Sequence, residues 1–284
     1  MVCMPTVDKI ASDIKSLKIQ GATHVALAVL DALEKTPDKA IGERLAYARP
    51  TEPLAQNAVR YIFGGENVTE RIARYKSFIT NAKTSITTYG STLIQDGKAY
   101  LTHCHASTVT NVFVTSHRSG KHIRVIATET RPLMQGRITV KELLDAGMKD
   151  VTLIVDSAAA SVLSDPNKPV DAVFVGADLL SDDGFVNKIG TLPIIIAAQE
   201  RRIPIYCFST LLKYDPLPFT PDRIETRPAS EVWPDAPSDL KTLTPAFDVV
   251  PYSENIRLVT EAGILPGDQV RLAASKHYPF IMNI

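Results

Sequence analysis

The spacing of apolar residues changes once along the chain, at Asp96-Gly97. Before this point apolar residues recur every three or four positions, which is the period of an amphipathic helix. The segments with this period are 7–17, 23–36, 52–64 and 68–94. The last of them is long enough to connect a helical part to whatever follows it. We therefore predict that residues 1–95 form an N-terminal helical domain with a connecting helix.

Beyond Asp96 short β-branched runs alternate with amphipathic stretches, and the runs include KAYLTHC, IRVIATET, VTLIVDS, DAVFVGAD and PIYCFS. Strands that are apolar on both faces and separated by helix-sized segments are typical of a doubly wound parallel sheet. We predict an α/β fold in which residues 96–284 form a Rossmann-like, doubly wound parallel-sheet domain. Ligands of such sheets bind beyond the carboxyl ends of the strands. The proline-rich segment 214–237 is predicted to be a loop that wraps the surface.

Composition excludes several classes of protein. The 31 Lys and Arg residues balance the 31 Asp and Glu residues, so the positive field that attracts nucleic acid or anionic lipid is missing. Cys3, Cys104 and Cys207 are far apart and form no CxxC or zinc-binding spacing, as expected of free thiols in a reducing compartment. No segment resembles a signal peptide or a membrane helix, and we expect a cytoplasmic protein. The sequence also lacks GxGxxG, GxxxxGK[ST], GxSxG and HExxH.

The first polar cluster, THCHAST, follows the first predicted strand and precedes a predicted helix. A thiol near a helix N-terminus is placed where backbone N–H groups favour thiolate and phosphate, so Cys104 is a candidate base or nucleophile. The alternative is that Cys104 is a small buried hydrophobe, the commoner fate of a cytosolic cysteine. His103 and His105 are too few for a complete metal site, and we predict no metal.

Two more clusters follow strands. In the segment 128–137, Arg131 offers a phosphate ligand and Gln135 a ligand for a hydroxyl group, although a solvated loop with a structural Glu–Arg pair has the same composition. In VGAD the small residues before Asp178 let a ligand approach the backbone while the carboxyl group faces it. An N-cap or turn role explains Asp178 equally well.

The fourth cluster, NKIGT, is predicted to open a helix. Asn187 provides an amide, and Lys188 is a candidate phosphate ligand, with an ordinary exposed lysine as the alternative.

Taken in order, THCHAS, ETRPLMQGR, VDSAA, VGAD and NKIGT resemble motifs of the translation initiation factor 2B alpha/beta/delta-like family. That family joins regulatory subunits to ribose-1,5-bisphosphate isomerase and methylthioribose-1-phosphate isomerase. The resemblance spans nearly the whole chain and includes the late step PAFD at residues 245–248. Five ordered motifs make a chance match very improbable, and THCHAS and VDSAA are more similar to the ribose-bisphosphate enzyme.

The resemblance implies that Cys104 and Asp178 are the catalytic residues, a pair that regulatory members do not generally retain. It implies substrate binding by Gln20, Gly21, Ala22, Arg49, Arg131, Gln135, Asn187, Lys188 and Lys213. At the first of these positions family enzymes usually have arginine. Glutamine should weaken a direct phosphate contact by roughly 1 kcal/mol or more.

The function implied is an aldose–ketose isomerase that converts ribose 1,5-bisphosphate to ribulose 1,5-bisphosphate in AMP metabolism, without a metal or a nucleotide cofactor. The alternatives are a methylthioribose-1-phosphate isomerase and a non-catalytic regulatory subunit. The expected partner is a small sugar phosphate, with self-association as a homodimer or homohexamer and no binding to nucleic acid or membrane.

Our mechanistic hypothesis assigns the carbon-bound proton to a Cys104 thiolate and the ring-oxygen proton to a protonated Asp178. It requires the pKa of the thiol to be lowered and the pKa of the carboxyl group to be raised.

Overall fold

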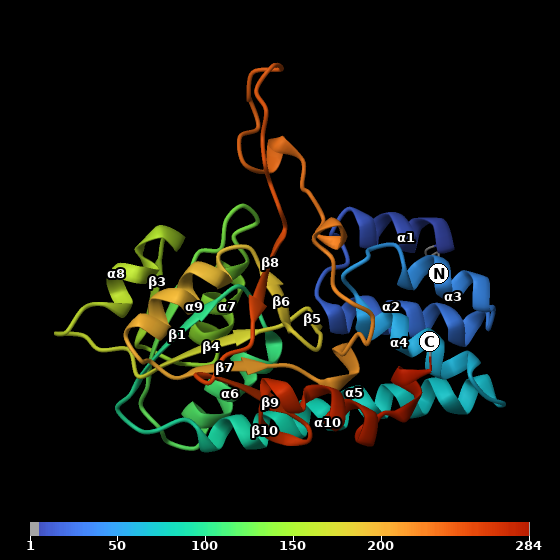
Figure 1. The fold of residues 1–284 in the computed structure, drawn as a ribbon, viewed down its shortest axis with the longest axis horizontal. Helices are drawn as coiled ribbons and strands as arrows, with labels where there is room; N and C mark the ends of the chain where they lie inside the picture. Colours follow the sequence, from blue (N-terminus) through green and yellow to red (C-terminus); the bar gives the residue numbers. More distant parts are fainter. Residues whose placement is uncertain (1–5, 284) are drawn as a thin grey trace.

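Helices make up the N-terminal part of the computed structural model, which describes residues 6–283 (Figure 1). They are α1 (Val7–Lys15), α2 (Ala22–Lys35), α3 (Lys39–Ala46), α4 (Pro53–Phe63) and α5 (Val68–Thr92). Side chains of Thr6, Asp38 and Asn67 accept hydrogen bonds from the first turns of α1, α3 and α5, and Pro53 opens α4. The long connecting helix is confirmed as α5. Helix α3 lies between two predicted segments and was not predicted.

A seven-stranded sheet forms the centre of the second part, in the order β10-β9-β7-β4-β1-β2-β3. All neighbours in it are parallel except β9 and β10. Its strands are β1 (Ala99–His103), β2 (Arg124–Thr128), β3 (Val151–Ile154), β4 (Ala172–Gly176), β7 (Ile205–Phe208), β9 (Ile256–Thr260) and β10 (Gly263–Pro266). The helices of this part are α6 (Ser107–Arg118), α7 (Gln135–Asp145), α8 (Ala159–Leu163), α9 (Thr191–Glu200) and α10 (Val270–His277). The predicted mostly parallel α/β sheet is confirmed.

Neighbouring residues on a strand point to opposite sides of the sheet, so each strand contributes side chains to both faces. Each of these faces is covered by helices. Tyr100 and Phe174 belong to an apolar cluster with residues of α5, α6 and α7. Leu101 and Val173 belong to a second cluster with residues of α8, α9 and the N-terminal helices. The N-terminal helices and the sheet therefore share one apolar core, and the division into residues 1–95 and 96–284 remains a prediction.

A small antiparallel sheet adds β5 (Leu179–Leu180), β6 (Gly184–Lys188) and β8 (Phe247–Pro251), in the order β5-β6-β8. The helix predicted to open in NKIGT is α9, which begins at Thr191 with Gly190 as its N-cap, whereas Asn187 and Lys188 end β6 and lie before the helix. Pairing with β8, which lies about sixty residues further along the chain, holds the segment extended.

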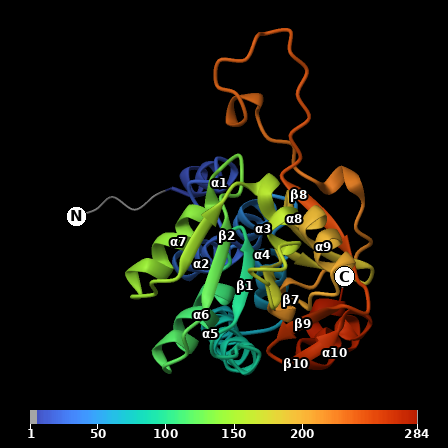
Figure 2. The same cartoon turned by 90° about the vertical axis from the view of Figure 1, so that its left-hand side faces the viewer.

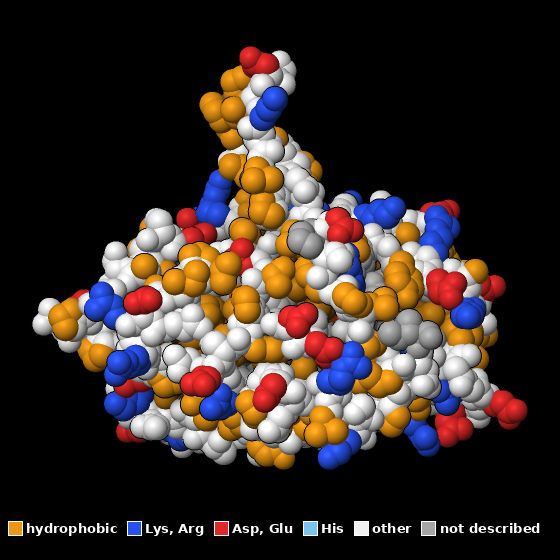
Figure 3. Space-filling model, in the orientation of Figure 1, with side chains coloured by type: hydrophobic (Ala, Val, Ile, Leu, Met, Phe, Trp, Pro, Cys, Tyr) orange, Lys and Arg blue, Asp and Glu red, His pale blue; other side chains and the backbone are white. Residues whose placement is uncertain are grey.

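Residues 226–245 form an arm that projects from the body of the molecule, above β8 in Figure 1 and again in the second view (Figure 2). Thr226 and Pro245 pair at its base. Its exposed apolar side chains gather on the projection in Figure 3, and they are Val232, Trp233, Leu240 and Leu243. The prediction of a loop that wraps the surface is therefore wrong for residues 226–237.

Within residues 6–283 no helix combines the length and the apolar character needed to span a bilayer. Of the three predicted free thiols, Cys104 and Cys207 are free and buried, whereas Cys3 lies outside the described residues.

Candidate functional site

The polar clusters meet where the strand order of the large sheet reverses. From β1 the chain moves outward through β2 and β3, and β4 then returns to the other side of β1. Cys104 follows β1 and Asp178 comes two residues after β4, while His103 and Val175 pair between these two strands. Because ligands of open α/β sheets bind at such a reversal, the structure brings Cys104 and Asp178 to the expected edge.

The backbone of Cys104 is strained. Its φ is 69°, in the left-handed region that costs a non-glycine residue about 1–2 kcal/mol. The Cys104 N–H donates to Thr130 Oγ1 (2.9 Å), and its carbonyl accepts from Thr139 Oγ1 (3.1 Å). Strain held in place by specific hydrogen bonds is typical of functional positions, so this observation supports a role for the thiol.

The thiol lies at one end of a short hydrogen-bond chain. Cys104 is 8% exposed, and its Sγ donates to Gln135 Oε1 (3.5 Å). Gln135 Nε2 in turn donates to Gln20 Oε1 (3.3 Å). This chain brings the start of α2, with Gly21 as its N-cap and Ala22 as its first residue, to the Cys104 side of the site. The exposed N–H groups of a helix start favour bound anions.

The protonation state of Cys104 differs from our hypothesis. Burial, with a smaller contribution from the carboxylate of Asp178, raises the pKa of the thiol to about 12. The ammonium group of Lys188 lowers this pKa but does not outweigh burial. Ionising such a thiol at pH 7 costs on the order of 7 kcal/mol. The raised pKa of Cys104 favours the protonated thiol, whereas our hypothesis requires a lowered pKa.

His103 connects the Cys104 turn to the turn after β6. Its Nε2 lies 2.9 Å from the carbonyl of Ile189, which can only accept, so Nε2 carries the proton. Its Nδ1 then accepts from Thr128 Oγ1 (2.6 Å). Burial lowers the pKa of His103 and keeps the ring neutral. A Cβ at Gly190 would lie 2.9 Å from this ring, so the contact requires glycine there.

Lys188 is a buried cation. It is 5% exposed, and its Nζ lies 4.8 Å from the centroid of the Phe247 ring. Among the described residues no carboxylate comes within 4.0 Å of it. Burying an unpaired ammonium group is costly, which indicates that an anion completes the site. The neighbouring Asn187 donates to Thr191 Oγ1 (2.9 Å) and thereby joins the end of β6 to α9.

A second group of charges surrounds Asp178. Lys213 Nζ donates to the carbonyl of Ala177 (2.6 Å), next to Asp178. Arg49 pairs with Glu52 (2.6 Å) and Glu225 (3.0 Å), so this predicted substrate-binding residue is already held by two carboxylates. Burial raises the pKa of Glu52 to about 7, an effect that Arg49 opposes and Asp178 reinforces.

Arg131 lies at the outer rim of the site. Its N–H and that of Thr130 donate to the carboxylate of Asp156 (2.7 Å each). Its guanidinium group donates to the carbonyl of Val232 (3.0 Å), which belongs to the arm. Arg131 is thus exposed and attached to the arm, further from the thiol than Gln135.

Sequence reasoning assigned no role to several residues that hold the site in place, namely Thr130, Thr139, Asp156, Glu52 and Glu225. Asp156 lies in the VDSAA motif and Glu52 follows Arg49 closely, so both carried a signal. Among residues 6–283 no group of three or more His, Cys, Asp or Glu side chains is arranged to hold a metal ion.

Comparisons with known proteins place the chain among close relatives. A sequence model described as the Initiation factor 2 subunit family matches residues 16–267. The ribose 1,5-bisphosphate isomerase of Archaeoglobus fulgidus is 35% identical, over 96% of this chain and 94% of that protein. The 5-deoxyribose 1-phosphate isomerase of Moorella thermoacetica is 32% identical, over 92% and 86%. A solved structure of the Pyrococcus horikoshii OT3 translation initiation factor eIF-2B has a TM-score of 0.79 at 25% identity, over 93% of this chain and 98% of that one.

Proposed function

The chain belongs to the Initiation factor 2 subunit family, and on this premise we propose that it is an aldose–ketose isomerase acting on a ribose 1-phosphate derivative. The proposed substrate is ribose 1,5-bisphosphate and the proposed product is ribulose 1,5-bisphosphate, as the name of the A. fulgidus relative indicates. The observation that carries the proposal is the meeting of a strained thiol, Cys104, with Asp178 at the reversal of the strand order, beside the buried cation Lys188. Such a site supplies a proton donor, a proton acceptor and a phosphate grip.

The reaction has two halves, opening of the ring and formation of the ketone, and each half needs two proton transfers. In the first half the C2–H bond and the bond between C1 and the ring oxygen break, C2 loses a proton and the ring oxygen gains one. The product is an open-chain enol phosphate. In the second half C1 gains a proton and the C2 hydroxyl loses one, which gives the ketose. The two halves together form an isomerisation that needs no oxidant or reductant.

The raised pKa of Cys104 favours a mechanism in which the thiol is the acid and Asp178 is the base, the opposite of the roles in our hypothesis. We propose that the thiol gives its proton to the ring oxygen while Asp178 takes the proton from C2. Asp178 then returns a proton to C1, and the thiolate recovers one from the C2 hydroxyl group. Each group ends in the protonation state in which it began.

The remaining predicted residues bind the substrate. We propose that Lys188 and the start of α2 hold one phosphate group, with Gln135 and Asn187 at the hydroxyl groups. Lys213 lies beside Asp178 and offers a second cation to the substrate. Arg49 reaches an anion only if it exchanges Glu52 or Glu225 for it, since both carboxylates now hold it. Arg131 would act from the rim.

An assay of ketose formation from ribose 1,5-bisphosphate tests the proposal. Because each acid–base partner contributes about 10²- to 10⁴-fold, Cys104→Ala and Asp178→Asn should each lower kcat by at least about 100-fold. Cys207→Ser is the matched control: it removes a second buried thiol, on β7 of the same sheet, and should keep wild-type activity. Full activity in either of the first two variants would remove that residue from the mechanism.

The pH dependence of the residual kcat/KM of Asp178→Asn tests which role the thiol has, because in this variant no carboxyl group titrates at position 178. A thiolate base with a pKa of about 12 would make the residual rate rise tenfold per pH unit between pH 8 and 10. A thiol acid remains protonated over this range, so we expect a flat profile. A tenfold rise per unit would restore the original assignment.

5-Deoxyribose 1-phosphate and methylthioribose 1-phosphate are the alternative substrates, and parallel assays rank the three by kcat/KM. The regulatory alternative predicts no turnover of any of them, together with capture of initiation factor 2 by the purified protein. Retention of both Cys104 and Asp178 supports the enzyme, because a sensor has no chemical need for the pair.

We further propose that the protein acts in the cytoplasm as a homodimer or homohexamer. The supporting observation is the apolar surface of the arm, where Leu243 is 89% exposed. Apolar side chains gathered on a projection favour contact with another chain. Sedimentation equilibrium measures the oligomeric state directly, and a monomer at micromolar concentration would contradict this proposal.

A further inference from the structure

The amino edge of the large sheet contains a cavity, at the end of the strands opposite to Cys104. Its volume is about 700 Å³, within the range of small-molecule sites. It is lined by residues at the starts of β1, β2, β3 and β4, among them Lys98, Arg124, Lys149, Lys168 and Asp171. Buried Ile123 and Met148 supply an apolar part of the wall.

Cations outnumber anions in this wall. Lys98, Arg124, Lys149 and Lys168 face only two carboxylates, of Asp150 and Asp171, whereas the chain as a whole has a formal net charge of zero. Lys98 is paired with Asp171 (2.9 Å). The other three cations have no carboxylate within 4.0 Å among the described residues. His117 and His122 add two ring systems to the same wall.

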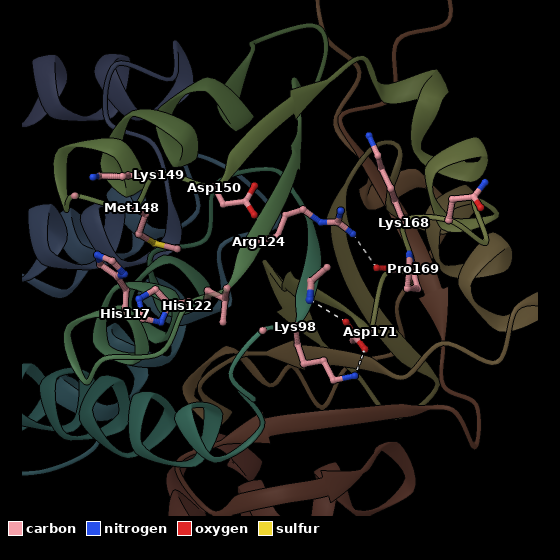
Figure 4. Close-up of a pocket in the computed structure, with 15 residues that line it drawn as sticks. Lys98, His117, His122, Arg124, Met148, Lys149, Asp150, Lys168, Pro169 and Asp171 are labelled. Carbon is pink, nitrogen blue, oxygen red and sulfur yellow. Dashed lines mark hydrogen bonds and ion pairs between the residues drawn. The ribbon is translucent and has the colours of Figure 1, made fainter.

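Arg124 is held in place without being neutralised. Its guanidinium group donates to the carbonyl of Pro169 (2.9 Å), and its Nε is buried without a hydrogen-bond partner. Figure 4 shows Arg124 reaching toward Pro169, with the Lys168 side chain extending away from this contact and with His117, His122, Met148 and Lys149 across the cavity, where Lys149 points outward. A fixed guanidinium group with free donors is the preferred protein partner of phosphate.

We propose that this cavity binds a small phosphorylated molecule, with Arg124 at the phosphate group, Lys149 and Lys168 adding positive charge from opposite sides of the cavity, and Ile123 and Met148 against its less polar part. The site is separate from the isomerase site, because Lys98 and Cys104 flank opposite ends of β1. Five residues of strand at about 3.3 Å each separate them, so one ligand of sugar-phosphate size does not occupy both. The proposal does not depend on the isomerase reaction.

Calorimetric titration with inorganic pyrophosphate at low ionic strength tests the proposal. The Lys188→Gln variant removes the buried cation of the isomerase site, and it should still bind one pyrophosphate. Adding Lys149→Gln and Lys168→Gln should weaken this binding at least tenfold. Neither lysine makes an ion pair with a described residue, so the fold should be unaffected. Arg124→Gln is a second variant and should have an effect in the same direction.

The matched control adds Lys35→Gln and Lys83→Gln to Lys188→Gln instead. These two exposed lysines on α2 and α5 carry the same charge but lie outside the cavity. The control should change the affinity less than twofold. Absence of binding to Lys188→Gln, or equal weakening by the two lysine pairs, would overturn the proposal. Crystals soaked in tungstate should show its anomalous signal beside Arg124, and a signal confined to the Lys188 site would also overturn it.

Discussion

The two edges of the large sheet use left-handed backbone differently. At the amino edge the residues with positive φ include Gly97, Gly120 and Gly147, at 75°, 92° and 90°, and each has room for a Cβ or at most a distant contact. At the amino edge Arg202 also has a positive φ, 55°, in the turn before β7. At the carboxyl edge the same region of φ includes Gly190, at 101°, but also two residues of the candidate site, Cys104 and Thr130, at 69° and 61°. Glycine adopts this backbone without cost, whereas other residues are strained there.

The difference separates a turn from a functional site. At the amino edge the chain has only to reverse direction, and its charged groups are exposed around an open cavity. At the carboxyl edge a side chain is kept despite the strain, and cations and carboxyl groups are buried. Free energy of folding has been given up there, and retaining a reactive group is the physical reason that fits.

Glycine substitutions test this difference between the two edges most directly. Gly190 at the carboxyl edge has φ 101°, and an added Cβ would lie 2.9 Å from the His103 ring. Gly120 at the amino edge has φ 92° and open space around it. Gly190→Ala should lower the free energy of unfolding by about 4 kcal/mol, because backbone strain and overpacking add. Gly120→Ala should lower it by only about 1–2 kcal/mol, from strain alone.

Urea unfolding of both variants measures the difference. It isolates the contact with His103, since the backbone strain is common to the two. Equal losses of unfolding free energy would show that the turn at His103 can move to accommodate a Cβ. The carboxyl edge would then be no more rigid than the amino edge.

The burial of Glu52 makes a prediction about pH. Its pKa is raised in the folded state from an ordinary 4.5 to about 7, so folding favours the protonated carboxyl group. The resulting stabilisation is complete below pH 4.5 and is lost as pH rises to about 7, a total of about 3 kcal/mol. Glu52→Gln has no such titration. Relative to wild type, its free energy of unfolding should therefore rise by about 3 kcal/mol between pH 4.5 and 8.

Comparing the two proteins at each pH cancels the titration of all other groups. A difference between them that is constant with pH would show that Glu52 is ionised in the folded protein, with Arg49 outweighing burial. The carboxyl edge would then be electrostatically as relaxed as the amino edge.

Much of the fold could be predicted because its signals are local. The helical period gave α1, α2, α4 and α5, and the β-branched runs gave the central parallel strands. The small antiparallel sheet could not be predicted in this way, because β6 pairs with β8 from a distant part of the chain. Polar residues at its end, Asn187 and Lys188, made the strand resemble the start of a helix.

The site was predictable to the same extent. The strand-end rule placed Cys104 and Asp178 at one edge, since it needs only strand order. Long-range partners were out of reach: Arg49 and Glu225 are 176 positions apart. The sequence shows the helix start that would lower the pKa of the thiol, whereas the burial that raises this pKa depends on tertiary packing.

The smallest expected effect is that of substituting Gln20, and it concerns only the pKa of the Cys104 thiol. Gln20 accepts from Gln135, which directs the Gln135 carbonyl toward Cys104 and keeps the thiol a donor. Arginine has no acceptor, so Gln20→Arg should turn the Gln135 amide and present its N–H groups to the sulfur. A donor and a cation near the sulfur both favour thiolate, and we expect the pKa of Cys104 to fall by about one unit, or about 1.4 kcal/mol.

The pH dependence of alkylation by iodoacetamide, in a background with Cys3→Ser and Cys207→Ser, measures this pKa without interference from the other thiols. Gln20→Glu is the control, because it keeps the acceptor for Gln135 and adds a negative charge, so the pKa should not fall. If arginine and glutamate shift the pKa in the same direction, the hydrogen-bond chain does not control the thiol. If only arginine lowers it, the neutral residue at position 20 is part of what keeps Cys104 a proton donor, and the absence of arginine there reflects the state of the thiol as well as the grip on phosphate.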